Sequence, residues 1–460
     1  MARGQQADAV SNRSGGDRLA NPAEEARCGT RFVSSPAARS FEDTGRWLTF
    51  LSTRASGGCA IRSGDPTGTA TAPGPTELEA KMAITIPGYT STTEGLRAGL
   101  AFFRAITIGL LTPVCAQIQA AESNPPPVPT QADVVYDNYR LRDGETVGRL
   151  RLHYATLGSP HRNANGEIDN AVMVLHWTGN SGASLLTPEY IKSLFAQGAP
   201  LDARRFYLIF PDNFGHGKST KPSDGLRAKF PHYGYNDLVD LQHRLIEETL
   251  GIKCLRAILG MSMGGMNAWQ WAERYPDQVD AIMPVVSLPA PVSGRNLLWR
   301  RMAIAEIRND PGWQRGDYTK PPLGFMQAYL LLRMMIDGVP HLQAEIPDPK
   351  AADSYMAAIA EQNAQSDPND LLYSLEASQD YDPEPDLAKV KAKVFALNFS
   401  DDEFNPDVLG VLQSRMKSVK NGHYLVQKGS SETYGHLTMA HPALWAEHVR
   451  EFVHDIEISP

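Results

Sequence analysis

A serine flanked by glycines is the strongest chemical signal in this sequence. The segment Gly260-Met261-Ser262-Met263-Gly264 follows a short apolar run typical of a strand and precedes a segment typical of a helix. In this G-x-S-x-G pattern the glycines permit a tight, strained turn that lifts the serine to the amino terminus of the helix. Peptide N–H groups there stabilise negative charge that develops during attack. We therefore predict that Ser262 is a nucleophile rather than part of an ordinary glycine-rich turn.

An acidic loop and a late histidine are candidates for the other members of a catalytic triad. A serine nucleophile needs a base, an acid must hold that base in one tautomer, and G-x-S-x-G enzymes carry them in the order serine, acid, histidine. Asp401 and Asp402 follow an apolar run at Val394–Leu397, and we favour Asp402 because it precedes the loop proline by four residues. Asp401 is then expected to be a solvated loop charge. His436 follows a later β-like run and is the predicted base.

Two backbone N–H groups are candidates for the oxyanion hole that a tetrahedral intermediate requires. One is that of Met263, the residue after the nucleophile, and the other comes from the loop after Leu175, where we favour Trp177. The string Gly215–Thr220 is similar to a phosphate loop, but Asp212 stands where that loop needs its first glycine. We therefore predict no nucleotide site. The histidines form no metal pattern, so no metal is expected.

The elements around these residues alternate between strands and helices. Several β-rich runs are continuously apolar, as strands covered on both faces are, and helical segments such as Tyr235–Leu250 separate them. This alternation predicts an α/β fold with a mainly parallel sheet and helices on both faces. The predicted strands lie at Arg149–Tyr154, Ala171–Leu175, Phe206–Phe210, Arg256–Leu259, Ala281–Val286, Val394–Leu397 and His423–Val426; further helices are predicted at Met266–Tyr275 and Pro442–His454.

A helical interval interrupts this alternation between about Pro289 and Asp386. It contains no convincing strand and carries Met and Leu residues at helical spacing. We predict an inserted helical cap (about 289–386) over the carboxyl edge of the sheet. Its apolar stripes are expected mainly to pack the cap itself, although a direct contact with substrate is compatible with that role.

The first 131 residues do not resemble part of the catalytic domain. Residues 1–81 are rich in Gly, Ser, Ala, Pro and Arg and are expected to be a disordered leader, or to lie upstream of a true start at Met82. Residues 82–116 have the order of a secretory signal peptide, with an apolar run too short for a stable membrane span. The alternative is an apolar helix in a leader or an amphipathic anchor. A Pro-rich linker (117–131) then precedes the catalytic domain, 132–460.

Composition and charge exclude several classes of protein. The chain has 460 residues, of which 42% are hydrophobic and 21% charged, and its net charge is −8. Without a basic block it is not expected to bind nucleic acid. Four cysteines, Cys28, Cys59, Cys115 and Cys254, fit neither a zinc site nor a disulfide framework. The composition is that of a soluble globular enzyme.

Taken together, the sequence resembles the homoserine O-acetyltransferase-like family of α/β-hydrolases over most of Ala132–Ile458. The resemblance implies the α/β-hydrolase fold, a ping-pong reaction through an acyl-serine, and a homodimer formed through the cap. It also implies that Arg301 and Tyr318 face the acceptor, the alternative for Arg301 being an ion pair within the cap. The matching motifs are His176-Trp177-Thr178-Gly179, Pro200-Leu201-Asp202, Pro211-Asp212-Asn213-Phe214-Gly215, Gly260 to Met266, Arg301-Met302-Ala303-Ile304, Asp310-Pro311-Gly312-Trp313 and Gly316-Asp317-Tyr318.

One position departs from the family pattern in a way that bears on the substrate. Homoserine enzymes of the family carry an aspartate directly after the catalytic histidine, and this chain has Leu437 there. We therefore expect a secreted or periplasmic hydrolase of small carboxylic esters that needs no cofactor. The alternatives are a cytoplasmic O-acyltransferase that uses acetyl-CoA as co-substrate, and a non-catalytic binding protein on a hydrolase scaffold. The intact set Ser262, Asp402 and His436 argues against the last.

Overall fold

The computed structural model describes residues 128–457 of this chain. The expected leader (1–81), the expected signal peptide (82–116), most of the linker and three of the four cysteines lie outside the described residues. No helix within 128–457 has the length and hydropathy that a membrane span requires.

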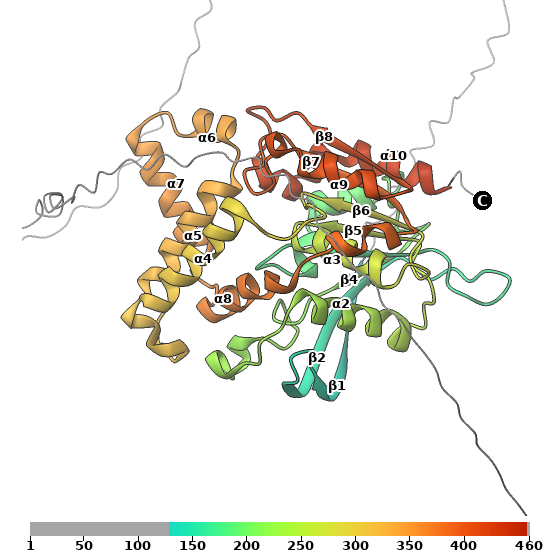
Figure 1. The fold of residues 1–460 in the computed structure, drawn as a ribbon, viewed down its shortest axis with the longest axis horizontal. Helices are drawn as coiled ribbons and strands as arrows, with labels where there is room; N and C mark the ends of the chain where they lie inside the picture. Colours follow the sequence, from blue (N-terminus) through green and yellow to red (C-terminus); the bar gives the residue numbers. More distant parts are fainter. Residues whose placement is uncertain (1–127, 458–460) are drawn as a thin grey trace, which may run out of the picture. The chain divides into compact units, whose positions relative to one another are not determined.

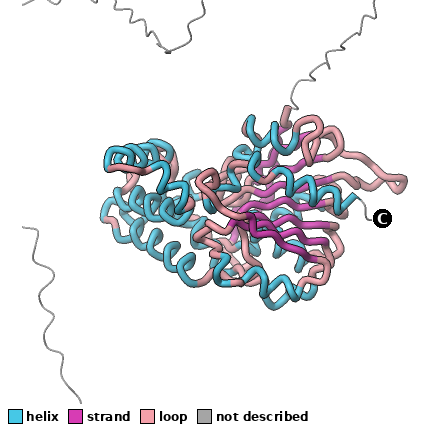
Figure 2. Tube along the Cα trace, turned by 90° about the horizontal axis from the view of Figure 1, so that it is seen from above, coloured by secondary structure: helices cyan, strands magenta, loops and turns pink. Residues whose placement is uncertain are grey.

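A single eight-stranded sheet organises the described residues. Its spatial order is β1-β2-β4-β3-β5-β6-β7-β8; β2 runs antiparallel to both neighbours and every later pair is parallel. Helices cover both faces (Figure 1, Figure 2), which confirms the predicted α/β class and the mainly parallel sheet. The strands are β1 (Thr130–Arg140), β2 (Thr146–Leu157), β3 (Ala171–Leu175), β4 (Tyr207–Pro211), β5 (Ala257–Met261), β6 (Ala281–Val285), β7 (Lys393–Phe399) and β8 (Gly422–Gln427).

The α-helices fall between and after these strands, joined by shorter 3₁₀ and π turns. They are α1 (Pro188–Tyr190), α2 (Tyr235–Arg244), α3 (Met263–Arg274), α4 (Gly294–Asn309), α5 (Leu323–Ile336), α6 (Val339–Glu345), α7 (Pro349–Gln362), α8 (Pro368–Glu376), α9 (Val411–Arg415) and α10 (Ala446–Glu457).

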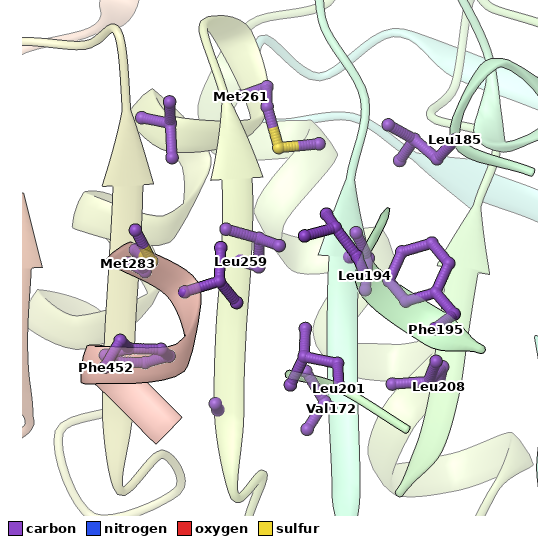
Figure 3. Packing of buried hydrophobic residues seen from close by; sticks show 14 of the residues in the cluster. Val172, Leu185, Leu194, Phe195, Leu201, Leu208, Leu259, Met261, Met283 and Phe452 are labelled. Carbon is purple, nitrogen blue, oxygen red and sulfur yellow. The ribbon is translucent and has the colours of Figure 1, made fainter. Parts of the chain in front are cut away.

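The central strands are apolar because both of their faces are buried. All residues of β3, β5 and β6 are buried, and successive side chains of β3 point to opposite layers. Val172 packs in the layer with Phe195 and Phe452, whereas Met173 packs in the layer with Trp269 of α3. Figure 3 shows the first layer. This double packing fixes the sheet and therefore the points at which the loops leave its carboxyl edge.

The largest differences from the sequence prediction are at polar or short elements. Strand β1 was not predicted, because it is an edge strand whose residues are mostly exposed and polar. Helix α3 begins at Met263, three residues earlier than the predicted Met266, directly after Ser262. The closing helix begins at Ala446 rather than Pro442, since Pro442–Leu444 forms a separate 3₁₀ turn.

Five helices, α4 to α8, fill residues 294–376 between β6 and β7, inside the interval 289–386 predicted as a cap. Helices α4 and α5 pack against each other, and α8 packs on α4. In Figure 1 these helices lie beyond one end of the sheet, in yellow and orange. Residues from α4, α5 and α8 line a pocket together with Ser262, so this layer covers the end of β5.

A buried acid in α3 makes the stability of the fold depend on pH. Glu273 is 7% exposed, and burial together with repulsion from Asp386 and Asp382 raises its pKa from 4.5 to about 9. A raised pKa in the folded state means that stability is fully present below the unfolded value and is lost as pH rises towards 9. Between pH 5 and pH 8 the unfolded chain releases this proton while the folded protein keeps it, so the free energy of unfolding falls by up to about 4 kcal/mol.

Glu273→Gln should remove this loss, because glutamine has the shape of the protonated acid and cannot ionise. We expect the variant to exceed the wild type in free energy of unfolding at pH 8 and to match it at pH 5, measured by urea unfolding. Glu306→Gln, at an exposed position of α4, is the matched control. A Glu273→Gln variant no more stable than wild type at pH 8 would show that Glu273 ionises freely.

Candidate active site

The turn between β5 and α3 holds Ser262 in a strained conformation. Its φ and ψ are 51° and −111°, a region that side-chain-bearing residues rarely adopt. A Cβ on Gly260 would overlap the carbonyl oxygen of Gly264, and a Cβ on Gly264 would overlap that of Leu175. These close approaches explain why both flanking positions are glycine. The turn places the Ser262 side chain at the carboxyl end of a central strand, where it lines the pockets described below.

The three residues predicted as a triad lie within hydrogen-bonding distance of one another. His436 Nε2 lies 2.9 Å from Ser262 Oγ, and His436 Nδ1 lies 2.8 Å from Asp402 Oδ2. All three side chains are buried. The Asp402 carboxylate also accepts the backbone N–H of Phe404 at 2.8 Å and the side-chain amide of Asn405 at 2.9 Å. With Nδ1–H donating to this fixed carboxylate, Nε2 is free to accept the serine proton.

The neighbouring acid, Asp401, has a different place from the one expected. It is half-buried, and its Oδ2 accepts the hydroxyl of Thr433 at 2.7 Å and the N–H of Gly435 at 3.2 Å. The expectation of a solvated loop charge was therefore wrong, because the carboxylate turns inward to the loop that carries His436. Asp401 ties that loop to the end of β7.

The two residues expected to supply the oxyanion donors are both close to the nucleophile in the fold. Met263 is the first residue of α3, where backbone N–H groups lack an acceptor within the helix. Trp177 lies on the loop after β3 and lines a pocket with Ser262. Its carbonyl accepts the ring N–H of His176 at 2.9 Å, while His176 Nε2 accepts the N–H of Asn213 at 3.1 Å. Burial lowers the pKa of His176 to about 4, so the ring is neutral and holds this loop in place.

Two pockets meet at Ser262 and His436, and Arg300 and Phe404 line both. We call the first, about 340 Å³, the apolar groove, and the second, about 320 Å³, the polar chamber. The apolar groove is formed mainly by Met266, Leu288, Ala290, Pro291, Val292, Phe404, Pro406, Val408, Leu409 and Val411. The polar chamber includes Thr178, Asn180, Arg300, Arg333, Gln362, Asn363 and Ser366, with Trp177 and Leu437 among its apolar residues.

Arg301 and Tyr318 are not brought to this site. Arg301 is exposed and lines a separate pocket. Tyr318 is buried inside the cap, where the Arg227 guanidinium lies 5.2 Å from its ring centre and the N–H of Asn369 donates to its hydroxyl at 3.4 Å. The expectation that both face the acceptor is therefore corrected: neither lines a pocket that contains Ser262.

The arginine that does line both pockets is Arg300, which the sequence analysis missed. It is 6% exposed, its Nε donates to Asn296 Oδ1 at 2.8 Å and its Nη1 donates to Ser378 Oγ at 3.4 Å. It has no carboxylate partner among the described residues. Neighbouring helix residues point about 100° apart, so a difference of one position turns a side chain away from the site. The sequence does show the adjacent pair Arg300-Arg301, which could have indicated an arginine at the site. It does not show which of the two side chains points toward Ser262.

The phosphate-loop-like string is a turn around the chain's own acid. Asp212 accepts the N–H of Lys218 and that of Gly182, both at 2.7 Å. These amides are therefore occupied by a carboxylate of the protein. Within residues 128–457 no group of three or more His, Cys, Asp or Glu side chains is arranged to hold a metal ion.

Comparison with known proteins agrees with this geometry. The family model described as the alpha/beta hydrolase fold matches residues 171–323. A probable acyltransferase of Methanothermobacter thermautotrophicus is 27% identical over 278 residues, which cover 60% of this chain and 84% of that protein. Homoserine O-acetyltransferase of Thermobifida fusca is 34% identical over 196 residues, covering 40% of this chain and 50% of that one. The chain thus spans about half the length of this acetyltransferase.

A solved structure extends the match over the described residues. An acetylester hydrolase from Corynebacterium glutamicum superposes with a TM-score of 0.62 at 22% identity, covering 71% of this chain and 96% of that one. The fold, the serine turn and the family match define an enzyme of the α/β-hydrolase superfamily. Within that superfamily the chain is similar, over part of its length, to homoserine O-acetyltransferases and to a probable acyltransferase.

Proposed function

We propose that this enzyme hydrolyses small carboxylic esters through a covalent acyl-serine intermediate. The observation that carries the proposal is the hydrogen-bonded series from Ser262 Oγ through His436 to Asp402, with distances of 2.9 Å and 2.8 Å. Ser262 Oγ attacks the ester carbonyl carbon while its proton passes to His436 Nε2. The N–H groups of Met263 and Trp177 stabilise the oxyanion, and Asp402 stabilises the imidazolium.

Release of the alcohol and hydrolysis of the acyl-enzyme then return the enzyme to its starting state. The ester C–O bond breaks, and His436 Nε2–H gives its proton to the leaving alcohol, which leaves the acyl group on Ser262. Water then attacks the acyl carbonyl and passes a proton to Nε2. When the second tetrahedral intermediate collapses, the carboxylic acid departs and Ser262 Oγ recovers its proton from His436. No cofactor enters either step.

Acyl transfer is the second candidate function, and one contact favours it. Arg300 lines both pockets and has no carboxylate partner among the described residues, so it suits an acceptor alcohol that carries a carboxylate. In that reaction acetyl-CoA would serve as co-substrate and donate the acyl group. Turnover of a chromogenic acetate ester by the full chain, assayed beside homoserine plus acetyl-CoA, separates the candidates. Ester hydrolysis without transfer supports our proposal, and rapid acetylation with little hydrolysis contradicts it.

Leu437→Asp tests whether the residue after the base decides between these reactions. Leu437 and Arg300 both line the polar chamber, so an aspartate at position 437 would add an anion for the ammonium of an amino-acid acceptor. We expect the ratio of homoserine acetylation to ester hydrolysis to rise on the order of tenfold or more. Leu437→Asn, which adds polarity without charge, should leave the ratio near that of wild type. An equal gain in both variants would show that charge at this position does not select the acceptor.

Export is part of this proposal on sequence grounds. Arg97 and Arg104 precede and enter an apolar run that ends at Ala116, the order of a signal peptide. An exported enzyme has no acetyl-CoA supply, which favours water as the acceptor. Amino-terminal sequencing of the native protein tests the idea, and a mature end at Met1 would contradict it.

A homodimer through the cap is also proposed. Leu298 on α4 and Met334 on α5 are 60% and 69% exposed, so the cap carries apolar side chains that a second copy could cover. Sedimentation of the purified protein at micromolar concentration should give a dimer mass, and a monomer under these conditions would exclude a stable dimer.

A further inference from the structure

The apolar groove leads from the nucleophile to the surface between two loops. Its walls come from the loop after β6, including Leu288 and Val292, and from the loop after β7, including Phe404 and Leu409. Ser262 and His436 also line it. Its volume of about 340 Å³ falls within the range of small-ligand pockets. A group attached to the reacting carbonyl can therefore extend into this groove.

We propose that the apolar groove binds the hydrocarbon chain of the acyl group, so that the preferred substrates are esters of medium-chain carboxylic acids. This inference rests on the ester hydrolysis proposed above and specifies its substrate class. Apolar surface buried from water is the main source of binding energy for such a chain. An acetyl group is too short to fill a groove of about 340 Å³.

The division between the two pockets favours the acyl chain over the alcohol. The acyl group stays on Ser262 during deacylation, while the acceptor must reach the same carbonyl from another side. The polar chamber, with Thr178, Asn180 and Gln362, offers hydrogen bonds to water and hydroxyl groups. The apolar groove contains Asn296 and Asn405, but both amides are already hydrogen-bonded within the protein. Its remaining, mainly apolar wall suits the group that stays bound.

At the opening of the apolar groove, two further apolar side chains are exposed to solvent. Val408 and Leu409 form a single 3₁₀ turn, and they are 92% and 66% exposed. Two adjacent, exposed large apolar side chains at the opening of an active-site groove are suited to contact a ligand. A chain that leaves Ser262 along the groove would cover both. The energy of that contact would grow with chain length.

The charged residues that line the apolar groove do not indicate a charged ligand. Arg295 lines the groove, but it forms an ion pair with Glu403, which lines it too. Arg300 lies at the junction with the polar chamber, with its guanidinium carbon 5.9 Å from the centre of the Phe404 ring. Away from Arg300 the charges of the groove are paired with each other, so the ligand that matches this part of the wall is an uncharged hydrocarbon.

The test compares p-nitrophenyl acetate, butyrate, hexanoate and octanoate with the full chain. Each buried methylene should raise kcat/KM by about fourfold until the groove is filled. A parallel series of alkyl acetates, from ethyl to octyl, lengthens the alcohol instead and should show no such rise. A flat or falling acyl series, or a rise confined to the alkyl acetates, would overturn the proposal.

Substitutions at the opening of the groove test whether the preference for long acyl chains depends on the groove. Leu409→Asp and Val408→Asp lie on an exposed turn, so folding should survive, and each should lower the octanoate-to-acetate ratio of kcat/KM by about tenfold. Leu226→Asp changes an exposed apolar residue outside both pockets and should leave that ratio unchanged. Equal ratios in wild type, Leu409→Asp and Val408→Asp would contradict a chain-binding groove.

The two proposals fail in different ways. If acetate esters turn over but longer acyl chains give no gain, only the groove assignment is wrong. If no ester turns over, the proposed hydrolysis fails, and the groove is then tested by calorimetric titration with octanoate. Binding by wild type that is weakened in Leu409→Asp would support the groove, and no binding by wild type would refute it.

Discussion

Ser262→Ala abolishes ester turnover in our account, with kcat lower by about 10⁶-fold, as for other serine enzymes that lose the nucleophile. The substitution removes the atom that attacks the carbonyl and leaves His436 and Asp402 in place. Alanine is no more strained than serine at a φ of 51°, so the turn should survive. Hydrolysis of p-nitrophenyl acetate measures the loss, and circular dichroism with thermal unfolding checks the fold.

A matched serine supplies the control for that experiment. Ser418 is exposed and lies outside both pockets, so Ser418→Ala should keep full activity. Near-normal turnover by a folded Ser262→Ala variant would overturn the mechanism, since the reaction would then proceed without Ser262 as the nucleophile.

Asp402→Asn should lower kcat by about 10⁴-fold with little change in KM. The Asp402 carboxylate accepts from Nδ1 of His436 at 2.8 Å, whereas an asparagine amide can present a donor to that nitrogen. The imidazole would then carry its proton on Nε2, which could no longer accept the proton of Ser262. A pH–rate profile for p-nitrophenyl acetate measures the effect.

Asp401→Asn is the matched control, because it changes the adjacent carboxylate in the same way. Asp401 binds Thr433 and Gly435 and does not reach the histidine ring, so the loss should stay below about tenfold and include some loss of thermal stability. If Asp401→Asn proved the more damaging to kcat, the assignment of the acid to Asp402 would be wrong.

The sequence predicted the turn around Ser262 because the determinants are local. A strand, a cramped glycine turn and a helix lie within about twenty residues, and the acid and base follow in the order that the fold imposes. The apolar strands were likewise predictable, since burial on both faces demands continuous apolar runs. Asp402 was preferred on loop spacing, and it is the acid that lies next to His436 in the structure.

The cap could not be predicted in the same detail. In α4 the charged Arg300 is buried along with Ala303, Ile304 and Ile307. Leu297 and Leu298 of the same helix are exposed, so the sequence does not reveal which face turns inward. That orientation depends on the packing of α4 against two other helices, α5 and α8, and not on the sequence of α4 alone. Tyr318 was misplaced for the same reason. Asp401 was misjudged because its partners, Thr433 and Gly435, lie on a loop more than thirty residues away.

Trapping the acyl-enzyme tests the central claim most directly. The full chain would be mixed with p-nitrophenyl acetate, quenched with acid during turnover, digested and analysed by mass spectrometry. We predict a single acetyl group on the peptide that contains Ser262, and none on that peptide in Ser262→Ala. Continued ester turnover with acetyl on another residue, or with no acetyl on Ser262 at any quench time, would contradict a covalent mechanism at this serine.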